Sequence, residues 1–132
     1  MEFKKNTKPE LSLVLPCYNE AQHIDKSIER IIQTLEDSRA TYEVILIDDK
    51  SKDDTVKHIK NIVKKNKNIR AFFHKANFGR GGTVKDGILK SRANIVGFID
   101  IDLEVAPGYI PHILRVLKNG EADMVVGQRH YP

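Results

Sequence analysis

The sequence predicts an α/β sandwich built on a doubly wound, mostly parallel sheet with helices on both faces. Two patterns support this fold class: five short apolar runs alternate with segments in which apolar residues recur every three or four positions. Continuous apolar runs are typical of strands buried on both faces, and the order βαβαβαβαβ leaves room for right-handed crossovers between parallel strands. A length of 132 residues suits one domain with a real core. We therefore expect a single domain over residues 1–132, with a loose tail at residues 1–9.

The five expected strands are short runs rich in branched and aromatic residues, each closed by proline or a polar residue. Their ranges are Leu11–Pro16, Tyr42–Asp48, Ile69–His74, Asn94–Asp100 and Asp123–Gln128. No apolar run approaches the roughly 20 residues that a membrane-spanning helix needs.

Between the strands, apolar stripes at helical spacing predict the helices. The expected helices cover residues 24–35, 56–63, 79–91 and 110–117, the third beginning in a glycine cluster. Asp53 or Asp54 can cap the second helix, and either Pro107 or Pro111 suits the first turn of the last helix.

Charge and cysteine content narrow the class of protein. The net charge is only +4, from 22 basic and 18 acidic residues, and we expect no nucleic-acid partner. Lysines at positions 57, 60, 64, 65 and 67 favour a solvated helix face over an anionic partner such as a membrane surface. The single Cys17 excludes an internal disulfide, fits a reducing compartment and suits a small buried core position.

The most distinctive segment is NIVGFIDIDLE, in which an apolar strand runs into Asp100, Asp102 and Glu104. In an extended chain these residues point to the same side, so three carboxylates would share one face and repel each other unless a cation lay among them. Mg²⁺ and Mn²⁺ prefer oxygen ligands, and Mg²⁺ takes its remaining ligands from water and phosphates. The pattern indicates either a metal site for a phosphorylated ligand or a solvated turn that is acidic by chance.

Polar clusters follow all five expected strands, at the edge where open parallel sheets bind their ligands. The clusters are Pro16-Cys17-Tyr18-Asn19-Glu20, Asp48-Asp49-Lys50-Ser51, Asn77-Phe78-Gly79-Arg80-Gly81-Gly82, Asp100 to Glu104, and Gly127-Gln128-Arg129-His130. The two aspartates of the second cluster either end the strand or accept hydrogen bonds from a base or ribose. The glycine cluster matches neither GxGxxG nor a P-loop, and is either a flexible loop or a backbone that approaches phosphates at a helix N-terminus.

These motifs resemble a known family. The series LVLPCYNEA, VILIDDKSKDDT, ANFGRGG, FIDIDLEVAPGYI and MVVGQRH resembles the family 2 glycosyltransferases with the GT-A fold, whose nucleotide-sugar-binding half is Rossmann-like. It is most similar to the dolichyl-phosphate and undecaprenyl-phosphate sugar transferases, and it covers the chain from Leu11 to His130. The most specific parts are P-x-Y-N-E, Asp-Asp-x-Ser, and D-x-D-L with a proline three residues beyond Glu104.

By this resemblance, the strand ends form a site for a nucleotide diphosphate sugar. The implied nucleotide-binding residues are Pro16, Tyr18, Glu20, Asp48, Asp49, Asp100 and Arg129. Tyr18 would pack near the base, the two neighbouring aspartates would contact base or ribose, and Arg129 matches the family's G-S-R segment.

The resemblance also implies a metal site at the D-x-D motif. Asp100 and Asp102 would be the catalytic pair that holds the diphosphate through Mg²⁺ or Mn²⁺. Glu104 stands where the family commonly has a glutamine, and is expected as a third metal ligand. Lys50 replaces the usual glycine of D-D-G-S, so either the turn differs or the lysine reaches a phosphate.

The implied activity is inverting, metal-dependent transfer of a hexose from a UDP- or GDP-hexose to a polyprenyl or dolichyl phosphate in cell-envelope synthesis. The chain ends at Pro132, just after the fifth expected strand, so we expect a truncated, donor-binding half. The expected location is the cytoplasm, at the membrane face, reached through parts outside this chain. The alternatives are a non-catalytic nucleotide-sugar-binding module and a transferase to a polysaccharide or another lipid acceptor.

Overall fold

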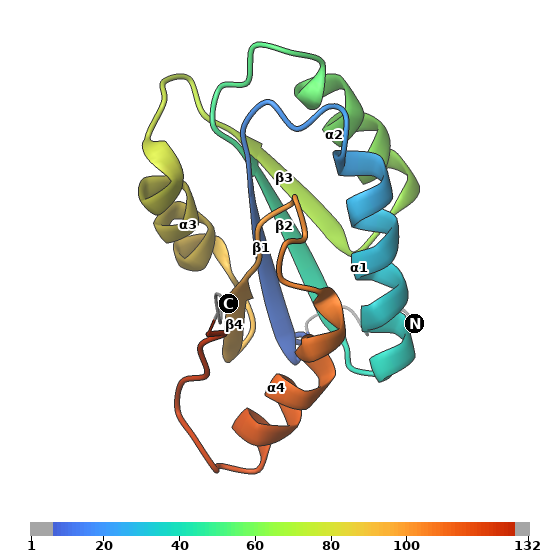
Figure 1. Ribbon diagram of the computed structural model, residues 1–132, viewed down its shortest axis with the longest axis vertical. Helices are drawn as coiled ribbons and strands as arrows, with labels where there is room; N and C mark the ends of the chain where they lie inside the picture. Colours follow the sequence, from blue (N-terminus) through green and yellow to red (C-terminus); the bar gives the residue numbers. More distant parts are fainter. Residues whose placement is uncertain (1–6, 129–132) are drawn as a thin grey trace, which may run out of the picture.

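Residues 7–128 are described in the computed structural model, which confirms an α/β sandwich with a parallel sheet (Figure 1). The strands are β1 (Leu11–Cys17), β2 (Tyr42–Asp48), β3 (Ile69–Phe73) and β4 (Ile95–Phe98). All pair in parallel in the order β3-β2-β1-β4. The chain adds β2 and β3 on one side of β1 and then returns to place β4 on the other side. The carboxyl ends of β1 and β4 therefore meet where the strand order reverses.

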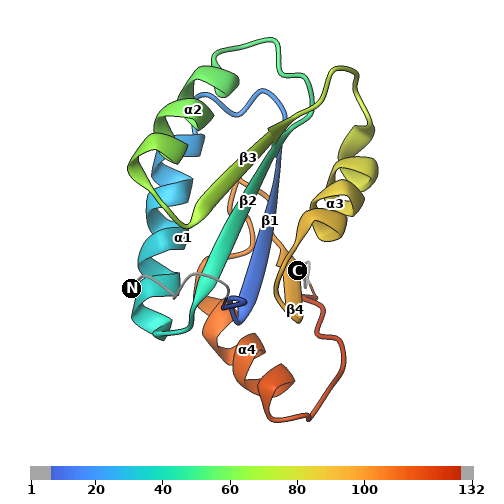
Figure 2. The same cartoon turned by 180° about the vertical axis from the view of Figure 1, so that it is seen from behind.

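Helices cover both faces of the sheet because β1 and β2 are apolar on both faces. The helical elements are α1 (Ile24–Ser38), α2 (Thr55–Lys65), α3 (Gly79–Lys90), the 3₁₀ turn η1 (Pro107–Tyr109) and α4 (Ile110–Lys118). Figures 1 and 2 show α1 and α2 on one side of the sheet and α3 on the other. Both predicted prolines occupy helix starts, Pro107 in η1 and Pro111 in the first turn of α4.

One glycine sets the distance between α3 and the sheet. A Cβ placed on Gly87 would lie 2.3 Å from Val14 Cγ1 and 3.0 Å from Ile47 Cδ1. The helix backbone can therefore approach β1 and β2 only because this position has no side chain. The close packing fixes where the first turn of α3 lies relative to the ends of those strands.

A buried polar network ties the chain together at the opposite, amino-terminal edge of the sheet. The Glu43 carboxylate accepts hydrogen bonds from Ser12 Oγ (2.6 Å), Arg70 Nε (2.9 Å) and the backbone N–H of Arg92 (2.8 Å). The Ser12 hydroxyl oxygen in turn accepts one from the N–H of Ala93 (3.0 Å). The buried Glu43 carboxylate is therefore satisfied by hydrogen bonds, and the bonds to Arg92 and Ala93 hold the connection from α3 to β4 in place.

The predicted fifth strand is wrong. Residues 123–128 form no regular strand, and both Met124 and Val126 are exposed. An apolar run becomes a strand only where a neighbouring strand accepts its backbone hydrogen bonds, and this segment joins no sheet. The third and fourth strands are also shorter than predicted, ending at Phe73 and Phe98, and as edge strands they are only partly buried.

Other features of the chain follow the sequence pattern. Lys57, Lys60 and Lys64 are exposed along α2, as a solvated helix face requires, and Cys17 is buried in the core. Within residues 7–128, no helix is both long enough and apolar enough to cross a membrane.

Candidate functional site

A pocket of about 480 Å³ opens at the carboxyl ends of the strands, at the point where the strand order reverses. Ligands of open α/β sheets bind at such switch points, and the volume suits a small molecule. The pocket is lined by Pro16, Cys17, Tyr18, Glu20, Asp49, Asn77, Gly79, Arg80, Thr83 and Asp100.

The structure brings together most of the residues predicted to bind a nucleotide. Pro16, Tyr18, Glu20, Asp49 and Asp100 all line this one pocket, although they come from three separate strand ends. The predicted Arg129 lies outside the described residues, as does its neighbour at position 130. The individual roles of these residues stay predictions, whereas their assembly into one wall is a property of the fold.

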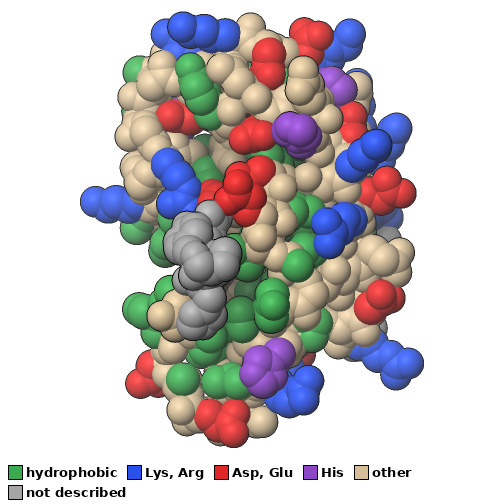
Figure 3. All heavy atoms as spheres, viewed as in Figure 1, with side chains coloured by type: hydrophobic (Ala, Val, Ile, Leu, Met, Phe, Trp, Pro, Cys, Tyr) green, Lys and Arg blue, Asp and Glu red, His purple; other side chains and the backbone are tan. Residues whose placement is uncertain are grey.

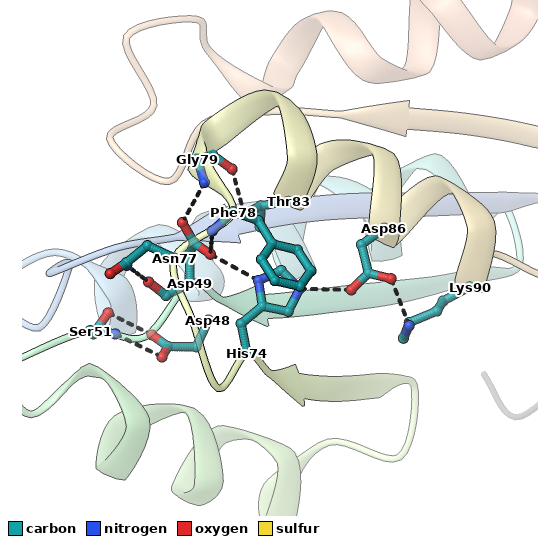
Figure 4. A network of polar contacts seen from close by, with 10 residues as sticks. All are labelled: Asp48, Asp49, Ser51, His74, Asn77, Phe78, Gly79, Thr83, Asp86 and Lys90. Atoms are coloured by element: carbon teal, nitrogen blue, oxygen red, sulfur yellow. Dashed lines mark hydrogen bonds and ion pairs between the residues drawn. The ribbon is translucent and has the colours of Figure 1, made fainter.

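The two adjacent aspartates at the end of β2 have different surroundings. Asp48 is buried, and its carboxylate accepts hydrogen bonds from the N–H (3.0 Å) and the hydroxyl of Ser51 (Figure 4). Both of its oxygens are thus directed into the turn, and Asp48 is not among the residues that line the pocket. Of the pair, Asp49 is the residue that faces the pocket.

Lys50 stands in this turn at the position where the family usually has glycine. Its φ is +57°, in the left-handed region that favours glycine. The turn therefore keeps the conformation that a glycine would adopt, and Lys50 adopts it at some cost in strain.

Asp49 anchors the start of α3 (Figure 4). Its carboxylate accepts hydrogen bonds from the backbone N–H groups of Phe78 (2.8 Å) and Gly79 (3.0 Å) and pairs with His74 Nδ1 at 2.9 Å. Burial raises the pKa of Asp49, but the bonds from Phe78, His74 and Gly79 outweigh it, so the pKa lies below its ordinary value. Asp49 is therefore a fixed, ionised acceptor in the pocket wall.

The glycine cluster is the ordered first turn of α3 and not a flexible loop. Gly79 has φ +78°, which a residue with a side chain rarely adopts, and its carbonyl accepts a hydrogen bond from Thr83 Oγ1 at 2.7 Å. Gly79, Arg80 and Thr83 all line the pocket. The amino end of α3 thus lies at the cavity, and its positive dipole favours anions, of which the Asp49 carboxylate already takes the N–H groups of Phe78 and Gly79.

The predicted alignment of three carboxylates on one strand face is wrong. β4 ends at Phe98, and the chain then turns, with Leu103 at φ +54° and its N–H bonded to the carbonyl of Asp100 at 3.1 Å. The buried side chains of Ile99 and Ile101 still alternate with Asp100 and Asp102, and it is the turn, with its positive φ at Leu103, that ends the extended conformation before Glu104. Asp102 is exposed, and its Oδ1 accepts the N–H of Glu104 at 3.1 Å.

Neither Asp102 nor Glu104 lines the pocket, and the part of the chain that the structure describes holds no cluster of three or more His, Cys, Asp or Glu side chains able to bind a metal. Of the three acidic residues in the motif, Asp100 alone faces the cavity. Any cation here would need further ligands from outside the protein.

Asp100 forms a two-pronged ion pair with Arg80. Arg80 Nε lies 2.9 Å from Oδ1 and its Nη2 lies 2.8 Å from Oδ2, and the guanidinium also lies over the ring of Phe98 at 5.4 Å from the centroid. The side chains are 58% and 34% exposed, respectively, so the pair is open to solvent. A positive side chain is unfavourable in the first turn of a helix. The position of Arg80 in the glycine cluster at the start of the predicted helix was the one sign in the sequence that Arg80 needs an anionic partner.

Negative charge is concentrated around this pair. Burial raises the pKa of Glu20, and the carboxylates of Asp102, Asp53 and Asp100 raise it further against a lowering effect of His23. Figure 3 shows acidic side chains gathered near the middle of the face seen in Figure 1, with basic side chains beside them. A cation that entered here would relieve the repulsion among these carboxylates.

His74 was not among the predicted site residues. Its buried ring lies between Asp49 and Asp86, and the other oxygen of Asp86 pairs with Lys90 Nζ at 2.7 Å (Figure 4). Burial lowers the pKa of His74, but the two carboxylates outweigh it, so the pKa lies above its ordinary value. No local pattern in the sequence marks this contact, because its partners are 25 and 12 residues away.

Sequence comparisons identify relatives of this chain. The profile of Glycosyl transferase family 2 matches residues 12–132. The dodecaprenyl-phosphate galacturonate synthase of Rhizobium johnstonii is 32% identical over 121 residues, covering 91% of this chain and 36% of that protein. The dolichyl-phosphate beta-glucosyltransferase of Dictyostelium discoideum is 38% identical over 99 residues, covering 70% of this chain and 30% of that protein. The chain thus spans about a third of the length of these curated relatives.

Solved structures share the fold. The mannosyltransferase PcManGT of Pyrobaculum calidifontis, solved with GDP-Man and Mn²⁺, has a TM-score of 0.72 at 19% identity, covering 85% of this chain and 33% of that one. TarS of S. aureus, solved with UDP-GlcNAc, has a TM-score of 0.71 at 20% identity, covering 93% and 37%. With the family profile matching from the first strand to the last residue, the chain belongs to glycosyl transferase family 2.

Proposed function

We propose that this chain is the donor-binding part of a glycosyltransferase that moves a hexose from a nucleotide diphosphate sugar to a polyprenyl or dolichyl phosphate. The observation that carries the proposal is the pocket at the switch point, where Asp49, the amino end of α3 and Asp100 share one wall. The names of the relatives support the lipid-phosphate acceptor, and the nucleotide sugars in the neighbouring structures support the donor.

The pocket offers a separate partner to each part of such a donor. Asp49 is ionised and accepts hydrogen bonds, so it suits the N–H groups of a base or a ribose hydroxyl. Tyr18 lines the pocket with its ring partly exposed, where it can pack beside the base, and Pro16 and Glu20 complete this side. The diphosphate would lie at the amino end of α3, near Arg80.

We further propose that a divalent cation, Mg²⁺ or Mn²⁺, is held by Asp100 of the pocket wall together with Asp102; Glu104, the predicted third ligand, forms no cluster of three with them among the described residues. Two carboxylates leave such a site open, so the cation would take its remaining ligands from water and the donor's phosphates. The concentration of negative charge that raises the pKa of Glu20 is what such a cation would balance. When bound, it would neutralise charge that develops on the departing nucleotide diphosphate.

Arg80 and the cation compete for Asp100 in this proposal. The Arg80 side chain occupies both oxygens of Asp100. An exposed ion pair of this kind opens at little cost, and the released guanidinium, already in the pocket wall, can pair with a phosphate oxygen. Arg80 would thus pass from the protein's carboxylate to the donor.

The acceptor phosphate is already anionic, so the transfer needs little help from a general base. Family membership implies inversion at the anomeric carbon, and a lipid acceptor implies work at the cytoplasmic face of a membrane. Both belong to the whole protein, of which this chain is expected to be a part.

Calorimetry with UDP, GDP, UDP-glucose and GDP-mannose, each with and without Mn²⁺, tests the donor site. We expect binding of at least one nucleotide that strengthens with Mn²⁺ and weakens in the Asp100→Asn variant. Asp123→Asn, an exposed aspartate outside the pocket, is the matched control and should bind as the wild type does. If none of the four ligands bound, the proposal would be refuted. Nucleotide binding without turnover on a lipid phosphate by the longer protein would favour a non-catalytic module.

A further inference from the structure

We propose that His74 is a positioning residue of the donor pocket, one that joins Asp49 to Asp86 and so fixes both the pocket carboxylate and the first turn of α3. This inference rests on the proposed function, because it assigns His74 a part in holding the donor. His74 itself is not expected to touch the donor, since it is absent from the residues that line the pocket.

The ring is held from three sides. His74 follows β3, and its backbone N–H donates to the carbonyl of Asp48 at 2.9 Å, which keeps it at the strand end. Its side chain is only 6% exposed, and its ring stacks on Phe78 with centroids 4.1 Å apart. Nδ1 lies 2.9 Å from Asp49 Oδ1, and Nε2 lies 2.7 Å from Asp86 Oδ2.

Both ring nitrogens face carboxylate oxygens, so the full set of bonds needs both nitrogens protonated. A carboxylate only accepts, and a neutral imidazole has one N–H. The charged groups that act on the ring are Asp49 at the end of β2 and Asp86 on α3, with Lys90 paired to the second oxygen of Asp86. When the ring loses a proton, one carboxylate faces a lone pair and that arm of the bridge opens.

The bridge that His74 forms between Asp49 and Asp86 affects the pocket through Asp49. The same Oδ1 that receives His74 also accepts the N–H of Phe78, and Oδ2 accepts the N–H of Gly79. Asp86 sits two turns further along α3, so the ring joins β2 to that helix at a second point. Opening either arm frees the carboxylate or the helix, and Gly79 and Arg80 lose their fixed position in the pocket wall.

The sign of the pH dependence follows from this geometry. The raised pKa of His74 means that the doubly bonded form is complete below the ordinary histidine pKa and is lost as the pH rises through the folded-state value. We therefore expect nucleotide affinity to fall across that titration, with Phe78 and Gly79 moving together with the ring. If His74 only stabilised the fold, the amide signals of Phe78 and Gly79 would not change together with the nucleotide affinity.

The test combines NMR titration and calorimetry on the 132-residue chain. The ring signals of His74 and the amide signals of Phe78 and Gly79 are followed against pH, and the affinities for UDP and GDP with Mn²⁺ are measured over the same range. The variant is His74→Gln, whose uncharged amide keeps an NH₂ donor group and so preserves folding better than alanine. The control is His58→Gln, because His58 Nδ1 also bonds an aspartate, Asp25, at 2.7 Å, on the outer helices.

We expect the two amides to titrate with the ring in the wild type, and His74→Gln to bind nucleotide roughly tenfold more weakly with a flattened pH profile. Amides that stay unchanged through the titration of His74, or a His74→Gln variant with wild-type affinity at every pH, would overturn the inference. The titration needs no nucleotide. A wild-type chain that binds neither UDP nor GDP would therefore refute the donor site, while the amide shifts still decide whether His74 positions Asp49.

Discussion

Replacing Arg80 by glutamine should change metal and nucleotide affinity in opposite directions. The Arg80 guanidinium neutralises Asp100 through two hydrogen bonds of 2.9 and 2.8 Å. Glutamine keeps a polar side chain but removes the charge. A cation that approaches Asp100 then no longer has to displace a cationic competitor, whereas a donor diphosphate loses a bidentate partner.

The magnitude follows from the exposure of the pair. Because the side chains are 58% and 34% exposed, their interaction falls in the range of about 0.2–1 kcal/mol that surface ion pairs contribute. Mn²⁺ should therefore bind the donor-free Arg80→Gln chain up to about fivefold more tightly, with little change in the free energy of unfolding. The affinity for UDP or GDP in saturating Mn²⁺ should fall by roughly tenfold or more, the scale of a charge-assisted hydrogen bond.

Electron paramagnetic resonance of free Mn²⁺ gives the metal affinity, and calorimetry gives the nucleotide affinity. Arg30→Gln, a charge-matched change at an exposed position of α1, controls for net charge and should alter neither value appreciably. If Arg80→Gln weakened or left unchanged the binding of Mn²⁺ in a folded chain, competition for Asp100 would be refuted. If nucleotide affinity were unaffected, the contact between Arg80 and the diphosphate would be refuted.

Four further changes test the helix packing, the buried polar network and a turn by urea denaturation. Gly87→Ala should lower the free energy of unfolding by about 1–3 kcal/mol, because the new Cβ would meet Val14 at 2.3 Å, even though alanine is the better helix former. Gly81→Ala in the same helix meets nothing within 4 Å and should raise that free energy by up to about 1 kcal/mol; equal effects of the two changes would contradict the close approach of α3. Glu43→Ala should cost roughly 3–5 kcal/mol, since it removes the carboxylate partner of Arg70 and the acceptor of the Ser12 hydroxyl and the Arg92 N–H, and a loss well below 1 kcal/mol would show that the buried network contributes little. Lys50→Gly should raise the free energy of unfolding by about 1 kcal/mol by relieving the positive φ, with nucleotide affinity unchanged; weaker nucleotide binding would instead show that the lysine reaches a phosphate.

The elements that the sequence predicts well are those whose pattern reflects burial on both faces. β1 and β2 are continuous apolar runs, and the core stripes of α1 and α2 repeat every three or four residues. The segment 123–128 has the same apolar character, but its pairing partner is not encoded locally, so composition alone predicted a strand that does not form.

The site was predictable in its location and less so in its geometry. Strand ends gather at one edge in any parallel sheet, which is why five of the predicted residues share a pocket. The strand ends at Phe98 and the chain then turns with a positive φ at Leu103, which the spacing of the acidic residues does not reveal. The contact of Arg80 with Asp100 and the bridge of His74 between two carboxylates join residues far apart in sequence, and only the fold brings them together.

A crystal structure of the chain with Mn²⁺ and the nucleotide that binds best in calorimetry tests the donor site most directly. The proposal predicts an anomalous manganese peak beside Asp100, the diphosphate at the amino end of α3, and Arg80 turned away from Asp100 toward a phosphate. A nucleotide bound elsewhere on the protein, or one seated in the pocket with the Arg80–Asp100 pair intact and no manganese beside it, would contradict the account.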